Sequence, residues 1–588
     1  MSPWTWILVG LLGYWALVST LRARGRLPEY VGTMGPILTV HTKRGRALLD
    51  RLAAPRRFWR AWGNLGLGFA LVVLVGVFAL LVFNAVSVVR NPPPPTAATK
   101  PQNVLVIPGV NEFLPLSVAP EIVIGLFVGM IVHEGGHGIL SRVEDIEVAS
   151  MGVALLAAIP IGAFVEPEEE SQRAADRGSR ARMFAAGVTN NFLVTVLAFG
   201  LLFGPVVGAM GVASGAAVGG VLPGSAADEA GISRGDRIVQ VGDVHVTRNA
   251  DLSAALGSIE AERVRVRLAS GTVVTVERRL QVTGMASPSP FATFAVNTTI
   301  ATVDGEPIRT EPEFERALRN ATVVTITSED GTAVTAPVGA LVTIVAGEPA
   351  ARAGFPADET AIVTRVGAHR VIDHRSLEDA LGDYAPGETV RVTAYVDGER
   401  RTLSVTLGEQ ADGSSFLGVR VYPGKSGMSV SDFGVKLFPT STYLSLLQGE
   451  VGGQGISGFV RSIGAVLILP FVGTIGAAGL EYNFAGFVAW NANFFTIHGP
   501  LAALGGGAFL LANLLFWTGW INLNLGFFNC IPAFPLDGGH LLRMSAESVV
   551  ARLPIEDRHA ATRAVTTSVG LVMLVSLVLM LFGPQLLS

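Results

Sequence analysis

Two histidines and a glutamate lie close together in an apolar part of the chain. They are His133, Glu134 and His137 of an H-E-x-x-H pattern, and residues 122–132 before them include no charged side chain. On a helix, residues four positions apart share a face, so both imidazoles can bind one Zn²⁺ while Glu134 acts as a general base on water. Ionisable side chains at membrane depth are costly and are usually functional. The pattern therefore predicts a catalytic zinc site within a membrane-spanning helix.

A catalytic zinc ion usually has three protein ligands, so this hypothesis requires a third ligand elsewhere. The natural candidate is Asp537, the first charged residue after the 55 residues from Tyr482 to Leu536 that contain no Asp, Glu, Lys or Arg. Its alternative role is a helix N-cap, because Asp before Gly-Gly suits a turn. The histidine pair also has an alternative, since two histidines on one helix face are more often packed or hydrogen-bonded than metal-bound.

The composition places the chain among integral membrane proteins. Of its 588 residues, 50% are hydrophobic and only 15% are charged, against about 25% in soluble domains. The net charge of −4 gives no indication of nucleic-acid binding. The single cysteine, Cys530, excludes an internal disulfide.

Long apolar segments predict the path of the chain through the lipid bilayer. We expect spans at 3–21, 65–88, 122–140, 183–207 and 565–587, and residues 462–536 are enough for three more. The loop at 22–60 holds ten Lys or Arg residues and is therefore expected in the cytoplasm. The metal site would then open toward the cytoplasm, with the polar central region outside. Because arginine supplies nearly all the positive charge, we favour the plasma membrane of a prokaryote.

Two polar or irregular segments flank the predicted zinc site. Met151 to Val165 is apolar but interrupted by Gly152, Pro160 and Gly162, which predicts a membrane-embedded loop or hairpin that could offer an edge to an extended substrate. Its alternative is an ordinary amphipathic connector. In the fourth span, the amides of residues 190–191 either hydrogen-bond neighbouring helices or orient a reacting group near the metal.

The central region contains a repeated pattern. The segments 241–243, 303–305 and 366–368 are each followed by a short helical pattern and then by β-type sequence. With the Pro-Gly-Ser-Ala segment at 223–226, these features closely resemble PDZ domains, which bind peptides by strand addition. We expect a polytopic α-helical membrane protein with an inserted soluble α+β region made of tandem PDZ-like domains.

The expected division of the chain has six parts. Residues 1–114 hold two spans, a basic loop and a Pro-rich linker, and residues 115–215 form the first half of the membrane core. A first PDZ-like domain covers 216–285, a degenerate half-repeat 286–340 and a second PDZ-like domain 341–422. Residues 423–588 form the second membrane half.

Taken together, these elements resemble the site-2 protease family of intramembrane zinc metalloproteases. The resemblance covers about residues 115–207 and 507–545 and rests on three elements. These are H-E-x-x-H at 133–137, G-V-x-x-N at 187–191 with Val188 in place of the family's proline, and N-x-x-P…L-D-G-G at 529–539 with Phe534 where a second proline is common.

The resemblance implies specific roles for the matching residues. His133, His137 and Asp537 would bind Zn²⁺ and Glu134 would be the general base, while Asn191 and Asn529 would support the site or orient the substrate. The substrates would be transmembrane segments of other membrane proteins, cleaved within the lipid bilayer in regulated intramembrane proteolysis. The PDZ-like domains would bind peptide or protein termini, or restrict access of untrimmed substrates.

Two other classes of protein compete with the protease. The first is a non-catalytic membrane adaptor whose PDZ-like domains bind peptide partners, but a purely structural zinc site has no need of Glu134. The second is a transporter that uses the same ionisable cluster as an ion relay. The large polar insertion and the absence of related helical halves argue against a transporter.

Overall fold

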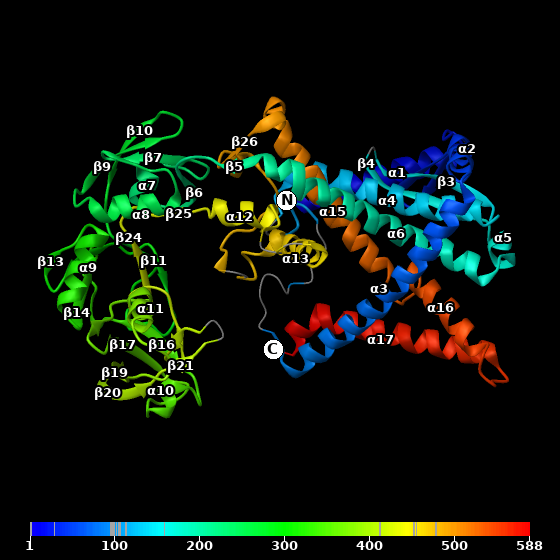
Figure 1. Cartoon of the computed structure of the whole chain (residues 1–588). Helices are drawn as coiled ribbons and strands as arrows, with labels where there is room; N and C mark the ends of the chain where they lie inside the picture. The colour runs from blue at the N-terminus through cyan, green and yellow to red at the C-terminus, as the bar shows by residue number, and fades with distance from the viewer. Residues whose placement is uncertain are drawn as a thin grey trace. The chain divides into compact units, whose positions relative to one another are not determined.

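The computed structural model describes residues 3–28, 30–93, 100, 103, 107–111, 114–157, 159–410, 413–450, 453, 455–476 and 479–587. The chain forms two compact units (Figure 1). The helical unit comprises Met1–Gly211, Ser441–Val488 and Ile497–Ser588, and the strand-rich unit comprises Val212–Thr440 and Ala489–Thr496. The short strands β5 (Met210–Val212) and β26 (Phe495–Ile497) lie where the chain passes between the units.

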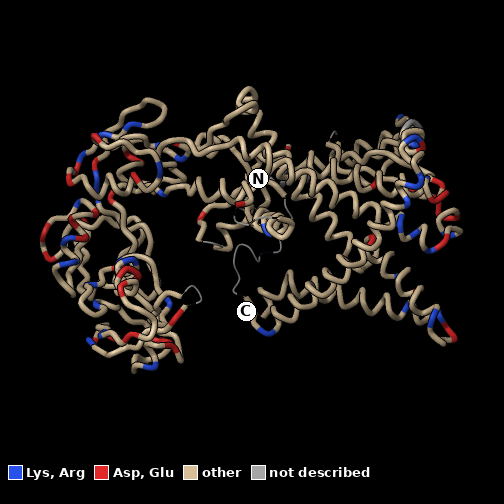
Figure 2. Tube along the Cα trace, in the orientation of Figure 1, with Lys and Arg blue, Asp and Glu red and all other residues tan. Residues whose placement is uncertain are grey.

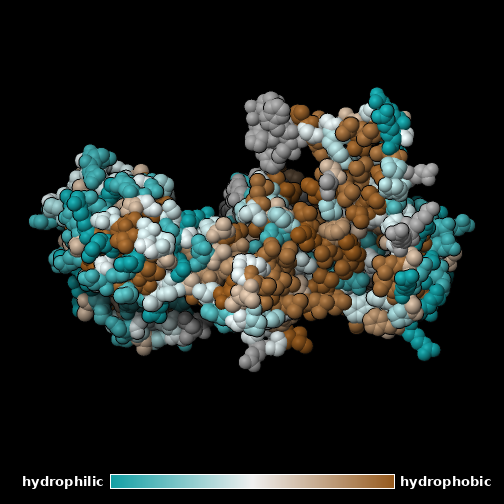
Figure 3. Space-filling view, turned by 90° about the horizontal axis from the view of Figure 1, so that it is seen from above, coloured by the Kyte–Doolittle hydropathy of each residue, from teal (hydrophilic) through white to brown (hydrophobic). Residues whose placement is uncertain are grey.

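Among the described residues, five helices are long and apolar enough to cross a membrane. They are α3 (Arg56–Arg90), α4 (Ala119–Val143), α6 (Arg177–Leu201), α15 (Gly507–Asn529) and α17 (Arg558–Leu586). Charged side chains are scarce along these helices (Figure 2), and the helices present a wide apolar surface (Figure 3). A helix within lipid needs apolar side chains on its outside. It also needs every backbone N–H and C=O group to be hydrogen-bonded within the protein, as in an α-helix. The chain is therefore a multi-pass membrane protein, as predicted.

The sequence between residues 462 and 536 is long enough for three spans but leaves their number open, and the described residues hold one. Only α15 is long enough to cross the lipid there, because α13 (Gly455–Ile468) has 14 residues and ends where Pro470 follows in a 3-10 turn. The short helices α12 (Thr440–Leu447) and α14 (Ala489–Ala492) are the other α-helices between residues 440 and 506 that the structure describes. The proline and glycine residues at 470, 499–500 and 505–507 interrupt the apolar sequence of this region.

The N-terminal part begins with α1 (Pro3–Ala23), an apolar helix of 21 residues at the place of the first predicted span. The predicted Pro-rich linker after Arg90 lies partly outside the described residues. An amphipathic helix, α2 (Lys43–Leu52), connects to α3 and buries Leu49 against the C-terminal part of α4.

A four-stranded antiparallel sheet lies beside α4. Its order is β1 (Val31–Met34), β2 (Ile37–His41), β3 (Val148–Leu156) and β4 (Ile159–Pro167). The hairpin predicted at 151–165 is thus present, and the N-terminal hairpin β1–β2 extends it by two strands. The alternative, an amphipathic connector, does not hold.

A cluster of charged side chains joins α3, α4 and α6 at the end of the spans. Glu144, directly after α4, accepts hydrogen bonds from Arg182 Nε at 2.8 Å and Ser179 Oγ at 2.7 Å, and Arg60 lies at 3.5 Å. Burial opposes ionisation, but these hydrogen bonds and the charges of the two arginines hold the pKa of Glu144 below its ordinary value. The carboxylate therefore stabilises the packing of these helices.

We expect Glu144→Gln to change the pH dependence of stability. A lowered folded-state pKa stabilises the fold above the ordinary value of 4.5, and this stabilisation is lost as the pH falls through the folded-state pKa. The melting temperature of the wild type in detergent should exceed that of Glu144→Gln at pH 7, and the two should converge in acid. The exposed Glu147→Gln is the control. A difference between wild type and Glu144→Gln that stays constant with pH would contradict this assignment.

The strand-rich unit consists of three modules, each with its own hydrophobic core. The first module contains β6 (Ala216–Val221), α7 (Ala226–Glu229), β7 (Arg237–Val241), β8 (Val244–His245), α8 (Asn249–Ser258), β9 (Arg263–Leu268), β10 (Val273–Glu277) and β25 (Val435–Leu437). The middle module contains β11 (Gln281–Met285), β12 (Ile300–Val303), β13 (Glu306–Pro307), α9 (Glu311–Asn320), β14 (Val323–Ser328), β15 (Ala333–Pro337) and β24 (Met428–Ser431). Their identity as PDZ-like domains stays a prediction.

The last module is continuous in sequence. It contains β16 (Ala340–Ile344), α10 (Pro349–Arg352), β17 (Thr360–Val366), β18 (His369–Arg370), α11 (His374–Gly382), β19 (Thr389–Val396), β20 (Glu399–Thr406), β21 (Gly408–Glu409), β22 (Ser415–Phe416) and β23 (Val419–Val421). Its main sheet has the order β20-β19-β17-β16-β23, and the first module has the corresponding order β10-β9-β7-β6-β25.

The modules are nested rather than consecutive. After the last module, the chain returns as β24 to pair with β11 and then as β25 to pair with β6. The strand-rich unit therefore extends to Thr440, beyond the boundary expected at residue 422. Short strands that pair with partners more than a hundred residues earlier carry no local sequence signal, which explains the difference.

A buried ion pair connects the first and middle modules. Arg278 has a fully buried side chain that pairs with Asp432 and donates to the carbonyl oxygen of Leu256 at 2.9 Å. Asp432 also accepts the backbone N–H of Glu311, at the start of α9. The returning segment is thus held to both modules by one carboxylate.

We expect Arg278→Met to destabilise the strand-rich unit strongly. Removing one partner of a buried ion pair leaves the other charge unpaired, at a cost of about 3–5 kcal/mol in the free energy of unfolding. Arg263→Met is the matched control, because Arg263 pairs with Glu277 at the surface and such pairs contribute about 1 kcal/mol or less. Amide hydrogen exchange of β11 and β24 in the purified full-length chain measures both effects. Similar exchange in the two variants would refute the assignment.

Candidate metal centre

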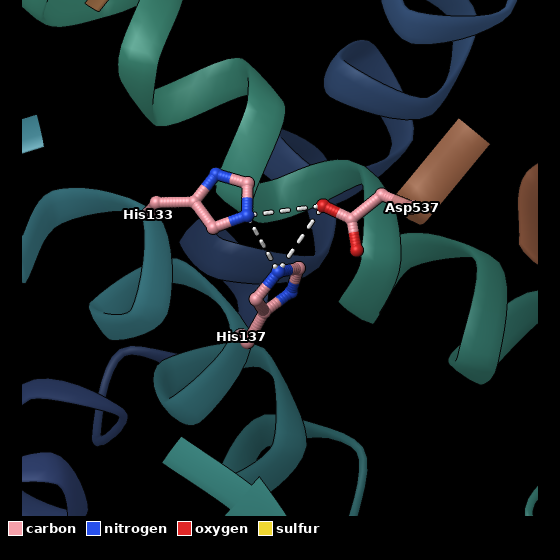
Figure 4. A group of neighbouring side chains, drawn as sticks. All are labelled: His133, His137 and Asp537. Carbon is pink, nitrogen blue, oxygen red and sulfur yellow. Dashed lines mark hydrogen bonds and ion pairs between the residues drawn. The ribbon is translucent and has the colours of Figure 1, made fainter. Parts of the chain in front are cut away.

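Three potential ligand atoms meet inside the helical unit. His133 and His137 lie one turn apart on α4, and Asp537 is the first residue of α16 (Asp537–Val550). The Nε2 atoms of the histidines are 3.2 Å apart, and Asp537 Oδ2 lies 3.1 Å from His133 Nε2 and 3.2 Å from His137 Nε2 (Figure 4). All three residues are less than a tenth exposed. The structure thus brings together the three residues that the sequence predicts as ligands.

Hydrogen bonds on the far side of each imidazole determine which nitrogen faces the cluster as an acceptor. His137 Nδ1 lies 2.9 Å from the carbonyl oxygen of Met183, which can only accept, so Nδ1 carries the proton. His133 Nδ1 lies 2.7 Å from Asn191 Oδ1 and donates in the same way. In the neutral imidazoles, both Nε2 atoms therefore present lone pairs to one another and to the Asp537 carboxylate.

Three acceptors at this spacing, with no donor between them, fit a bound cation. Asp537 Oδ2 is buried and has no hydrogen-bond partner among the described residues. Two imidazole nitrogens and one carboxylate oxygen form a donor set typical of catalytic zinc. Tetrahedral ligands of zinc lie about 3.3 Å from one another, close to the spacing of the three atoms here. The residues present therefore fit Zn²⁺ and leave one position for a further ligand.

The alternative role of Asp537 as an N-cap does not apply. The N-cap of α16 is Leu536, and the Asp537 side chain faces the histidines. Gly539 lies so close to the preceding loop that a Cβ there would be 2.7 Å from the backbone carbon of Ala533. This close approach allows the loop and the first turn of α16 to fold tightly on each other.

A glycine on α6 leaves room for the imidazoles. A Cβ at Gly187 would lie 2.7 Å from His137 Nε2 and 2.9 Å from His133 Cε1, so any larger residue would displace a ligand. At Gly136 on α4, a Cβ would lie 2.8 Å from the carbonyl oxygen of Ala186. Helices α4 and α6 therefore need glycine on both sides of their contact. Val188, in place of the family's proline, is buried within a continuous α6.

Asn191 contacts a ligand directly. Its Nδ2 donates to the carbonyl oxygen of Gly129 at 3.1 Å and to Asn522 Oδ1 at 2.9 Å, which orients its Oδ1 toward His133. Asn522, on α15, is fully buried and donates in turn to the carbonyl oxygen of Thr518. The sequence analysis missed Asn522, although a fully buried amide within an apolar span was an available signal.

Glu134 and Asn529 lie in different surroundings. Glu134 Oε2 accepts the backbone N–H of Val165 on β4 at 2.9 Å, and its side chain is partly buried. Asn529, the last residue of α15, donates to the carbonyl oxygen of Leu525 in its own helix at 3.0 Å. The role of Asn529 in supporting the site or orienting the substrate stays a prediction.

We expect Asn191→Ala to weaken zinc binding, because the substitution removes the acceptor that fixes the orientation of His133. Loss of such an outer partner typically lowers metal affinity about 10- to 100-fold. Asn529→Ala is the matched control and should change the affinity about twofold or less, since among the described residues the Asn529 amide bonds to the carbonyl oxygen of Leu525 in its own helix and to no metal ligand. Competition with a zinc-binding dye measures both. Equal affinities would show that Asn191 does not support His133.

Comparison with known proteins places this geometry in a family. The sequence model described as Peptidase family M50 matches residues 121–577, most of the chain. A protein of Methanocaldococcus jannaschii described as uncharacterized is 29% identical over 200 residues, which are 33% of this chain and 50% of the relative. The chain thus spans about half the length of that relative. Because the family match includes both α4 and α16, the chain belongs to peptidase family M50, the site-2 protease family of intramembrane zinc metalloproteases.

Proposed function

We propose that this protein is a zinc endopeptidase that hydrolyses peptide bonds within transmembrane segments of other membrane proteins. The observation that carries the proposal is the buried convergence of His133 and His137, on a helix long enough to span a membrane, with Asp537 at the start of α16. Glu134 directly follows His133 in the sequence. A structural zinc site does not require a general base, so the presence of Glu134 favours catalysis over the adaptor.

Each residue has a defined role in the proposed reaction. His133, His137 and Asp537 hold Zn²⁺, which when bound supplies a Lewis acid that makes water more acidic and polarises a carbonyl group. Glu134 accepts a proton from the attacking water as the new C–O bond forms. It returns that proton to the amide nitrogen as the C–N bond breaks, which yields a carboxylic acid and an amine.

The substrate must be extended where it is cut, because carbonyl groups within a helix are hydrogen-bonded and shielded. Strand β4, at the edge of its sheet and packed along α4, is suited to hold such a segment by strand addition. Transmembrane segments with weak helix propensity near the cut would therefore be preferred.

The strand-rich unit suits a role in substrate selection. We propose that its modules are PDZ-like domains that bind peptide or protein termini outside the cell and admit substrates already trimmed by an earlier cleavage. Two corresponding sheets with edge strands β23 and β25 support peptide binding by strand addition. With the basic loop at 22–60 in the cytoplasm, the metal site would open toward the cytoplasm of a prokaryotic cell.

We expect Glu134→Gln to abolish cleavage while zinc is retained. Loss of a general base costs about 100-fold or more in rate, whereas the three ligands are untouched. Asp537→Ala should lose both zinc and cleavage, and Glu147→Gln, at the surface, is the matched control. Purified variants are incubated with single-span membrane proteins, and zinc is measured by mass spectrometry. Zinc binding by a wild type that cleaves neither full-length substrates nor substrates already trimmed of their outer domain would favour the adaptor, and absence of zinc after reconstitution would exclude the protease.

A further inference from the structure

The proposed general base is bonded to the edge of the sheet. Glu134 Oε2 accepts the backbone N–H of Val165 at 2.9 Å. Strand β4 lies along α4, so this bond connects the helix that carries the metal ligands to the last strand of the four-stranded sheet (Figure 1). The three metal ligands do not depend on the hydrogen bond between Glu134 and Val165. This hydrogen bond therefore points to a role other than metal binding.

The register of the sheet shows that Val165 faces outward. Val165 lies opposite Met151 of β3, and the carbonyl oxygen of Met151 accepts the N–H of Thr42 on the opposite side of β3. In antiparallel sheets, the N–H and C=O of a residue point to the same side, so Val165 and Met151 form a non-hydrogen-bonded pair. The N–H and C=O of Val165 therefore both point away from the sheet.

Ala163 faces the same way as Val165. It lies opposite Val153, and the register between positions 163 and 165 is uninterrupted. Residues two apart on a strand direct their backbone groups to the same side. The outward edge of β4 thus presents the N–H and C=O of Ala163 and the C=O of Val165, which have no hydrogen-bond partner among the described residues. Glu134 occupies the N–H of Val165. Glu134, Ala163 and Val165 are each partly exposed rather than fully buried.

We propose that the N–H of Val165 positions Glu134 and, by being occupied, sets the register in which an extended substrate is cut. This inference rests on the proposed function. A substrate residue opposite Ala163 forms both backbone hydrogen bonds with β4. The substrate residue opposite Val165 can donate to the Val165 carbonyl oxygen, but its own carbonyl group finds no donor on the strand.

That unpaired carbonyl group is the one to be hydrolysed. It lies beside Glu134 and is free of the strand, whereas its neighbour along the edge is held by Ala163. One peptide group on β4 therefore has two consequences: it orients the carboxylate that takes the proton from water, and it leaves a single substrate carbonyl available for attack. Val165 is a positioning residue, and the edge at Ala163 contributes to binding.

Two proline substitutions on the same strand separate these roles. Proline removes an N–H and is tolerated at an edge where that N–H is outside the ladder. Relative to Val165→Ala, which keeps the N–H, Val165→Pro should lower kcat about 10- to 100-fold with little change in KM, because Glu134 is no longer held in place. Ala163→Pro should raise KM about fivefold with little change in kcat, because one substrate hydrogen bond is lost.

A binding measurement that does not depend on catalysis accompanies the kinetics. Metal-free protein, prepared with a chelator, is titrated with a fluorescently labelled single-span substrate that the wild type cleaves. Ala163→Pro should weaken this binding about fivefold, and Val165→Pro should not change it. Zinc content and melting temperature of each variant exclude misfolding as the cause.

Three outcomes would overturn the inference. These are a kcat for Val165→Pro equal to that of Val165→Ala, equal kcat losses in both proline variants, and a rise in KM in both. Each requires a wild type that cleaves the substrate, so failure of this inference is distinguishable from failure of the proposed function, in which the wild type itself is inactive.

Discussion

The structure depends on three lone pairs held within 3.2 Å of one another inside an apolar helical unit. Such an arrangement is repulsive unless a cation lies among the acceptors, so it persists only because the far side of each imidazole is fixed. The Met183 carbonyl oxygen and the Asn191 side chain provide this on α6, and Asn522 extends the support to α15. The site therefore draws on four helices, although its ligands come from two.

Close packing of these helices is the second condition. Gly136 and Gly187 let α4 and α6 approach until backbone meets backbone, and Gly539 does the same for the loop that precedes α16. In lipid, where water gives no hydrophobic drive for helices to associate, small residues at contacts and buried amides supply much of the association energy. Glycine and asparagine thus both set the geometry and contribute to the stability of the site.

Much of the candidate site could be predicted from the sequence, because helical spacing places His133 beside His137 and because the first carboxylate after a long uncharged segment is Asp537. The sequence predicted one hairpin of the four-stranded sheet but not the pairing of β2 with β3, and it did not predict the role of Asn522. Both depend on contacts between residues far apart in the sequence, which local patterns do not show. The number of spans after residue 462 could not be counted from the sequence, because proline and glycine residues interrupt the apolar segments there and hydropathy does not say which segments stay helical. The PDZ-like identity of the modules, the topology and the substrate stay predictions.

The nested order of the three modules has a consequence for biosynthesis. During translation, all strands of the last module are available once β23 has been made, whereas the middle module waits for β24 and the first module for β25. The chain enters and leaves the last module at neighbouring points, where the N–H of Ser426 donates to the carbonyl oxygen of Gly339. The last module can therefore fold first and the first module last, and the three modules cannot all be complete before the ribosome has passed residue 437.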